Sequence, residues 1–416
     1  MQDGLLTEAR LDDALTRVLK VRFRLGEFDP ADRVPYRQIP LSVLNSPAHR
    51  GLSLETSRQS IVLLQNHDHL LPLDRAKIKS IALVGPLAIH FVAGDSHYIG
   101  DFPRDIVDIV RGIRDRAPGV ELSTAVGAEV APPLEPQEGA VPQPFDHDGE
   151  LKKAVAAAQS ADVALICVGT TQAMEKESWD RTTLALPGNQ QQLVEAVYAA
   201  NPRSIVILFN AGPLTIPWIK AHIPAILAAW HSGQEQGHAV ADVLFGDINP
   251  AGRLPYTVYA SEAQVPPRDE YDVSKGFTYM YLRGDPLFAF GHGLSYTQFK
   301  YSNLKLSAPQ VACNGTVTVS VDVENSGGRE GDEVVQLYTH AAKPSVIRPL
   351  KELRGFARIS LKPGEKKTVS LSVPAAKLAF YDETRHAFRV EPGKYDLLLG
   401  ASSADIRSSA RLKVTV

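Results

Sequence analysis

Two carboxylates, Glu175 and Glu177, stand one residue apart in the segment QAMEKESWDRTTLALPG. Trp179 and the pair Asp180–Arg181 follow at once. A carboxyl group serves as a general acid near neutral pH when burial or a like-charged neighbour raises its pKa, and a second carboxylate and an aromatic wall can supply both effects. The segment is therefore a candidate for acid/base catalysis, and a solvated acidic loop is the plainer alternative.

The other residues of this segment allow two kinds of role. Asp180 and Arg181 suit a structural pair, because charge-assisted contacts fix loop geometry well. Trp179 suits either a platform on which a sugar ring stacks or a core anchor, and the residues alone leave that choice open.

Other chemistry is not indicated. His231 and His238 lie seven residues apart with no third ligand in step, so we predict no metal site, and we predict no cofactor. Glu235 has a structural reason for its place, because it precedes a predicted helix and complements the helix dipole. GDINPAG lacks the Lys-Ser/Thr that completes a phosphate-binding loop, and no Gly-x-Ser-x-Gly elbow is present.

The elements that must position the segment alternate in type. We predict helices over 50–66, 149–161, 188–200 and 233–245. Between them lie short apolar runs at 80–85, 162–169, 204–210 and 225–230. Such runs are typical of parallel strands covered on both faces, which predicts an α/β sandwich with an open, mostly parallel sheet over 41–257. Ligands bind at the carboxyl ends of such strands, and the candidate segment follows the second run.

The ends of the chain differ from this pattern. Residues 1–40 hold a helix whose apolar residues, among them Leu11, Leu15 and Val18, lack a partner nearby. Residues 258–297 read as an irregular linker. From 298 to 416, short stretches alternate apolar with polar residues between Gly- and Pro-containing turns, which predicts an all-β antiparallel sandwich.

Composition excludes several classes of protein. The 416 residues are 44% hydrophobic and 22% charged, with a formal net charge of -3, so neither a nucleic-acid nor a membrane partner is indicated. No run of 18 apolar residues occurs, and the N-terminus has no apolar core of a signal peptide. Two cysteines exclude a disulfide framework.

Five stretches, in order, resemble the C-terminal portion of glycoside hydrolase family 3, the β-glucosidase and β-xylosidase family. They are SRQSIVLLQNHDHLLPL, EKESWDRTTLALPGNQQQLVEAV, AWHSGQEQGHAVADVLFGDINPAGRLP, PLFAFGHGLSYTQF and, similar to a fibronectin type III-like domain, DEVVQLYTHAAKPSVIRPLKELRGFARISLKPGEKKTV. The family's Glu-Gly-x-Asp-Arg stands here as ESWDR, with Ser178 in place of Gly. The resemblance therefore implies that Glu177 is the acid/base, with Glu175 as the runner-up.

The resemblance also implies a partner. Complete members carry a (β/α)8 barrel that supplies the nucleophilic Asp, and a barrel needs about 250 residues. We expect that barrel in cis or in trans, and a β-glycoside as substrate. The alternative is a non-catalytic carbohydrate-binding or interaction module. The sugar, the oligomeric state and the location, periplasmic or secreted in the parent enzyme, stay open.

Overall fold

The computed structural model describes residues 4–89, 105–130, 144–171, 174–175 and 181–416. The chain divides into two compact units, Met1–Leu52 and Ser53–Val416. No described helix combines the length and the apolar character needed to cross a bilayer.

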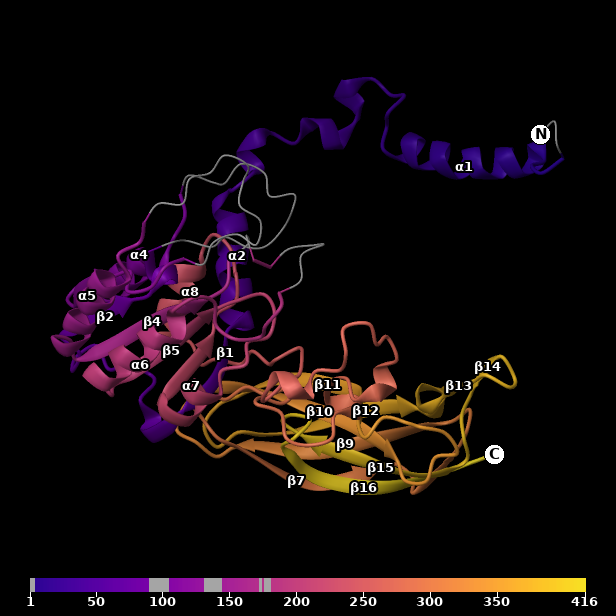
Figure 1. Ribbon diagram of the computed structural model, residues 1–416. Helices are drawn as coiled ribbons and strands as arrows, with labels where there is room; N and C mark the ends of the chain where they lie inside the picture. Colours follow the sequence, from indigo (N-terminus) through magenta and orange to yellow (C-terminus); the bar gives the residue numbers. More distant parts are fainter. Residues whose placement is uncertain (1–3, 90–104, 131–143, 172–173, 176–180) are drawn as a thin grey trace. The chain divides into compact units, whose positions relative to one another are not determined.

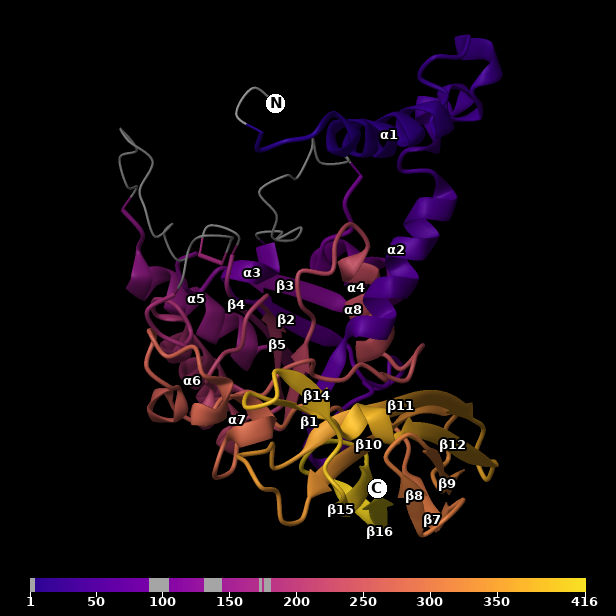
Figure 2. The same ribbon diagram turned by 90° about the vertical axis from the view of Figure 1, so that its right-hand side faces the viewer.

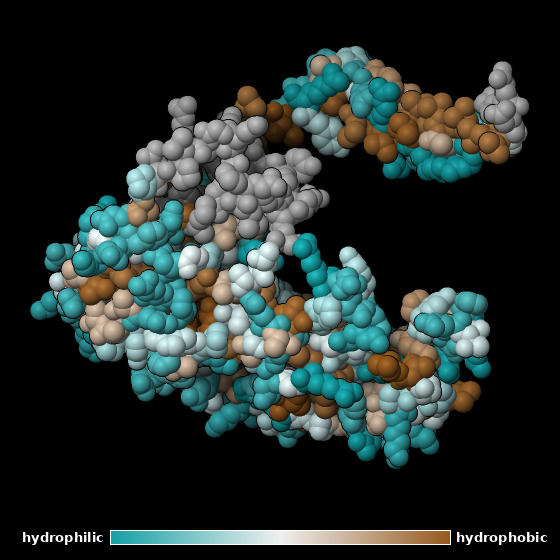
Figure 3. All heavy atoms as spheres, viewed as in Figure 1, coloured by the Kyte–Doolittle hydropathy of each residue, from teal (hydrophilic) through white to brown (hydrophobic). Residues whose placement is uncertain are grey.

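The first unit consists of one long helix and short turns. Helix α1 spans Glu8–Arg24, and the side chain of Thr7 caps it by accepting a hydrogen bond from the Arg10 N–H at 3.2 Å. Three 3₁₀ turns follow at Ala31–Arg33, Pro35–Gln38 and Leu41–Val43. Leu11, Leu15 and Val18 are exposed, and Figure 3 shows apolar residues along one side of α1. The predicted helix is confirmed, and no residue of α1 is buried within its own described unit.

The second unit begins with a six-stranded sheet in the order β1-β6-β5-β4-β2-β3. All neighbouring strands are parallel except β1 and β6, which are antiparallel. The strands are β1 (Val62–Asn66), β2 (Ser80–Val84), β3 (Glu121–Ala125), β4 (Val163–Gly169), β5 (Ser204–Phe209) and β6 (Ala225–Ala228). The predicted open, mostly parallel sheet is confirmed.

Helices lie on both faces of this sheet (Figure 1). In β4, Leu165 and Cys167 pack into the core with α4 and α8, whereas Ala164, Ile166 and Val168 pack into the core with α5 and α6. This two-sided burial explains why the strand sequence is apolar without alternation. The helices are α2 (Pro47–Ser60), α3 (Pro86–Ile89), α4 (Ile109–Arg116), α5 (His147–Gln159), α6 (Gln190–Ala200), α7 (Pro217–His222) and α8 (Gln236–Leu244).

One predicted element is wrong in part. The helix predicted over 50–66 ends at Ser60, and Val62–Asn66 form strand β1 instead. Val62 and Leu64 pack on one face of the sheet and Leu63 on the other. A short apolar run fits a buried strand as well as a buried helix, so periodicity could not separate the two.

Residues 299–416 form the all-β part, as predicted. A five-stranded sheet in the order β11-β10-β15-β16-β8 faces a three-stranded sheet in the order β12-β9-β7 (Figure 2), with one core between them. Burial alternates along β9, as expected for a strand with one face inward. The strands are β7 (Phe299–Leu306), β8 (Gln310–Ala312), β9 (Thr316–Asn325), β10 (Gly331–Ala341), β11 (Glu352–Leu361), β12 (Lys366–Pro374), β15 (Gly393–Gly400) and β16 (Ile406–Thr415), with a hairpin of β13 (Phe380–Asp382) and β14 (Ala387–Arg389).

The α/β part and the all-β part meet along a polar seam and belong to one compact unit. Arg253 Nη2 lies 2.9 Å from Glu333 Oε2, and Tyr301 donates its hydroxyl to Glu333 Oε1 at 2.6 Å. Asn249 donates to the Glu330 carbonyl at 3.0 Å. The irregular segment before the seam contains helix α9 (Thr278–Tyr281). The predicted domain boundaries at 41, 258 and 298 stay predictions.

Candidate active site

The candidate site lies at the carboxyl edge of the sheet, where β4 and β5 end side by side. Gly169 ends β4 with a φ of 144°, and a Cβ there would lie 1.9 Å from the Phe209 carbonyl oxygen of β5. Glycine therefore allows the two strand ends to meet at this point. The chain leaves β4 through Thr170 directly into the segment that carries the two glutamates.

Glu175 is held by the ends of both strands. Its side chain is 8% exposed. Oε2 accepts hydrogen bonds from the N–H of Ala211 at 2.8 Å, from the N–H of Gly212 at 3.2 Å, and from the Thr170 hydroxyl. Glu175 is thus a buried carboxylate surrounded by donors.

Arg181 approaches the same carboxylate from the far end of the segment. Its Nε lies 3.0 Å from Glu175 Oε1, and its side chain is 10% exposed. Its Nη2 donates to the Pro213 carbonyl at 2.7 Å. Glu175 Oε1 has no aligned hydrogen-bond donor, so the contact between the two side chains is a charge contact. Arg181 therefore pairs with Glu175, and the predicted partner Asp180 lies outside the described residues.

Among the described residues of this edge, four side-chain oxygens of neutral residues are buried without a hydrogen-bond partner. They come from the segments that follow β4, β5 and β6 and from the start of α8: Thr171 Oγ1, Asn210 Oδ1, Ser232 Oγ and Gln236 Oε1. Buried polar atoms without partners are uncommon, and each calls for a physical reason. A concentration of them at the ligand-binding edge of a parallel sheet is typical of a functional surface.

Two aromatic residues, Trp230 and Tyr256, pack against each other beside the site. Trp230 has a φ of 59°, unusual for a residue other than glycine, and its indole N–H donates to the Ser60 carbonyl at 2.8 Å. Tyr256 packs edge-on against Trp230, with ring centroids 5.8 Å apart, and its hydroxyl accepts a 3.4 Å hydrogen bond from Asn210. Burial raises the pKa of Tyr256, so the phenol stays neutral.

The sequence predicted the position of this site but only some of its residues. Glu175 and Arg181 lie at the predicted edge, whereas Glu177, Trp179 and Asp180 lie outside the described residues, and their predicted roles stay predictions. Asn210 could have been found, because it is the last residue of a predicted strand. Nothing in the spacing of Tyr256 signals its place here.

Glu235 and His238 take part in contacts between two helices. Glu235 Oε2 lies 2.8 Å from His238 Nδ1, and Asp115 Oδ2 lies 2.9 Å from His238 Nε2, so the imidazole links α4 to α8. In the described part of the chain, no cluster of three or more His, Cys, Asp or Glu side chains is placed to hold a metal ion.

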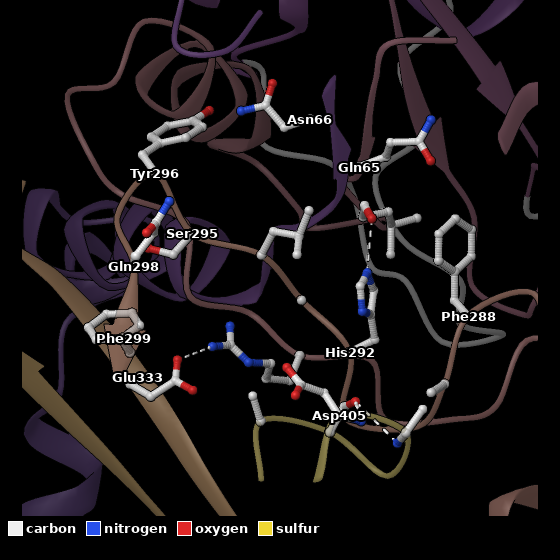
Figure 4. Close-up of a pocket in the computed structure, with 18 of the residues that line it drawn as sticks. Gln65, Asn66, Phe288, His292, Ser295, Tyr296, Gln298, Phe299, Glu333 and Asp405 are labelled. Carbon is white, nitrogen blue, oxygen red and sulfur yellow. Dashed lines mark hydrogen bonds and ion pairs between the residues drawn. The ribbon is translucent and has the colours of Figure 1, made fainter. Parts of the chain in front are cut away.

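A groove of about 1210 Å³ lies at the opposite edge of the sheet, along the seam (Figure 4). Asn66, which lines it, pairs with Ala225 at the start of β6. Its walls are bonded internally: His292 Nε2 lies 2.9 Å from the Leu64 carbonyl, and Lys220 Nζ donates to the Leu287 carbonyl. Burial lowers the pKa of His292. These side chains hold the seam together, so we place the candidate active site at the carboxyl edge.

Known proteins resemble this chain throughout. Residues 61–296 match the Glycosyl hydrolase family 3 C-terminal domain, and residues 333–403 match the Fibronectin type III-like domain. A β-xylosidase from Formosa agariphila is 37% identical over 94% of this chain and 54% of its own length. A periplasmic β-glucosidase from Salmonella typhimurium is 36% identical over 99% of this chain and 56% of its own length.

Solved structures agree. The structure of a β-glucosidase from Erythrobacter marinus superposes with a TM-score of 0.84 and 31% sequence identity, covering 100% of this chain and 56% of that one. The chain thus spans about half the length of the curated relatives it matches. The resemblance stated from the sequence is confirmed: the chain belongs to glycosyl hydrolase family 3, as the C-terminal α/β domain followed by the fibronectin type III-like domain.

Proposed function

We propose that this chain is part of an exo-acting retaining β-glycosidase of the β-glucosidase or β-xylosidase type, which hydrolyses terminal non-reducing β-linked sugars. Family membership is the observation that carries the proposal, since similar relatives bear the names β-xylosidase and β-glucosidase. The carboxyl edge, with its buried polar atoms and flanking aromatic rings, supports a sugar-binding role for this face.

In this proposal Glu177 is the general acid/base. A general acid must come within hydrogen-bond reach of the glycosidic oxygen. The contacts of Glu175 argue against Glu175 in that role, because Oε2 is occupied by two N–H groups and a hydroxyl, and Oε1 faces Arg181. Of the two glutamates of the segment, Glu177 is then the one left for chemistry, and Trp179 is a candidate for contact with the sugar.

The mechanism needs a second carboxylate. In a retaining glycosidase one carboxylate attacks the anomeric carbon while the other protonates the leaving oxygen, with the two groups about 5–5.5 Å apart. We assign the attacking carboxylate to a (β/α)8 barrel, supplied in cis or in trans, as the family resemblance implies. Glu177 donates its proton in the first step and takes one from water in the second.

The test is complementation with a barrel. The 416-residue chain is mixed with a separately expressed family barrel and assayed on nitrophenyl β-glucosides and β-xylosides. We expect negligible release of nitrophenol by the chain alone and hydrolysis by the mixture. Glu177→Gln should then lower kcat on poor leaving groups by about 10²–10⁴-fold.

Glu195→Gln is the matched control, because this carboxylate lies on the outer side of α6 and bonds Gln191. It should leave kcat unchanged. Full activity of Glu177→Gln contradicts the acid/base assignment. Sugar binding without hydrolysis, even with an active barrel, favours the carbohydrate-binding alternative over the enzyme.

A further inference from the structure

We propose that Glu175 and Arg181 are positioning residues, whose ion pair fastens both ends of the intervening segment to the turn after β5 and so holds Glu177 at the carboxyl edge. The inference rests on the proposed role of Glu177 and extends it to residues that do not touch the substrate.

The first support is the cradle around Glu175. Consecutive N–H groups at Ala211 and Gly212 point at one carboxylate oxygen, 2.8 and 3.2 Å away, and the Thr170 hydroxyl donates to the same atom. Successive backbone N–H groups in a turn form a concave site for an anion. The side chain of Glu175 fills that site from within the chain, which fixes the start of the segment.

The second support is the position of Arg181. Its guanidinium contacts Glu175 and the carbonyl of Pro213, so both charged side chains are bound to the same turn. Gly212 permits this approach, because a Cβ there would lie 3.1 Å from Glu175 Oε1 and 3.2 Å from Arg181 Nη2. The contact joins residues six apart in the chain, and a contact between two such positions limits how far apart the chain can carry them.

The third support is the pattern of charge. Arg181 Nε faces Glu175 and its Nη2 binds the Pro213 carbonyl, although its buried Nη1 has no hydrogen-bond partner among the described residues. Because both charged groups face each other, we give the pair no role in proton transfer. Catalytic groups have to be held close to their productive geometry by neighbours whose own contacts are fixed. A buried ion pair that joins both ends of a short segment to the end of a neighbouring strand meets this requirement.

The test uses the full chain and a protease that cleaves after lysine, because Lys176 is the lysine between Glu175 and Arg181. Glu175→Ala should raise the cleavage rate at Lys176, followed by mass spectrometry, by about tenfold or more, as the open form gains population. Formate, a small carboxylate that fits the emptied cradle, should restore slow cleavage. Arg181→Gln, which removes the other partner of the pair without adding a cleavage site, should also raise the cleavage rate at Lys176.

Asp162→Asn is the matched control. Asp162 Oδ2 accepts two backbone N–H groups, from Lys79 at 2.7 Å and Ser80 at 3.1 Å, at the opposite edge of the same sheet. This variant removes an equivalent carboxylate and should leave cleavage at Lys176 unchanged. Equal cleavage in the wild type and Glu175→Ala, or acceleration that formate does not reverse, overturns the proposal.

A functional readout separates positioning from mere support of the fold. In the complex with a barrel, Glu175→Ala should lower kcat for poor leaving groups more than KM changes, formate should restore it, and azide should not. A normal rate for Glu177→Gln overturns the proposed function, whereas normal cleavage at Lys176 in Glu175→Ala overturns the positioning role alone.

Discussion

The two edges of the six-stranded sheet differ in whether their buried polar atoms have hydrogen-bond partners. At the carboxyl edge, neutral polar atoms of Thr171, Asn210 and Ser232 are buried without hydrogen-bond partners. At the seam on the opposite edge, both oxygens of Glu333 are bonded, one to Arg253 and one to the Tyr301 hydroxyl.

The difference separates a surface built for binding from a surface built for stability. A buried polar atom without a partner costs about 1–3 kcal/mol of folding free energy, so it persists where another requirement keeps it. At the seam, the Glu333 carboxylate, the Tyr301 hydroxyl and the Asn249 amide nitrogen have partners within the chain, although the buried Nε of Arg253 has none among the described residues. We therefore expect substitutions at the seam to change stability, and substitutions of the neutral polar residues without partners at the carboxyl edge to change function with little effect on stability.

The largest stability effect should come from Glu333→Ala. It leaves the Arg253 guanidinium buried at the seam without its carboxylate and removes the acceptor of the Tyr301 hydroxyl. Loss of one partner of a buried ion pair lowers the free energy of unfolding by about 3–5 kcal/mol, which urea denaturation measures. Glu324→Ala, which breaks an exposed pair with Lys366, is the control and should cost about 0–1 kcal/mol. Equal losses in the two variants contradict the claim that the ion pair at the seam stabilises the fold.

A smaller effect at the seam should depend on pH. Burial lowers the pKa of His292, so the folded chain binds this proton less readily than the unfolded chain. Stability is then lost as the pH falls from about 6.5 toward the lowered pKa of the folded chain, and each tenfold difference in proton affinity between the two states is worth about 1.4 kcal/mol. His292→Gln should flatten the fall in Tm between about pH 8 and pH 5. His386→Gln, on an exposed hairpin, should not, and equal pH dependence in all three proteins contradicts the prediction.

The smallest effect should come from a matched pair of threonines. Thr171 at the carboxyl edge and Thr297 at the seam are both 8% exposed, but within the part of the chain that the structure describes only the Thr297 hydroxyl has a partner, since it donates to Asn325 Oδ1 at 2.7 Å. Thr171→Val should be neutral or stabilise the protein by up to about 1 kcal/mol, whereas Thr297→Val should cost about 1–2 kcal/mol. Thermal unfolding measures both changes in stability, and a larger loss of stability for Thr171→Val than for Thr297→Val would contradict the prediction.

Much of the fold could be predicted from the sequence, because strands that are buried on both faces of a sheet have continuous apolar sequences. In the run at 162–169, the residues after Asp162 are all apolar since β4 packs into a core on each side. Strand β3, Glu121–Ala125, was missed because it lies at the edge of the sheet and is only partly buried. The end of α2 was misplaced because the apolar run after Ser60 fits either kind of element.

The candidate site was predictable in position but not in its contacts. The rule for parallel sheets brings the segment after β4 to the correct edge. The partners of Glu175 come from Ala211 and Gly212, which are far away in the sequence and are brought near by the pairing of β4 with β5. Charge spacing alone favoured an Asp180–Arg181 pair, whereas the described guanidinium contact is with Glu175.

The most direct test of the account compares the two glutamates of this segment in the complex with a barrel. Glu177→Gln and Glu175→Gln are assayed on aryl β-glycosides of graded leaving-group pKa, with and without azide. The account predicts that Glu177→Gln loses about 10²–10⁴-fold in kcat on poor leaving groups, less on good ones, and is partly rescued by azide. Glu175→Gln should show a smaller loss and no rescue. Leaving-group dependence and azide rescue in Glu175→Gln, with near-normal rates for Glu177→Gln, would contradict it.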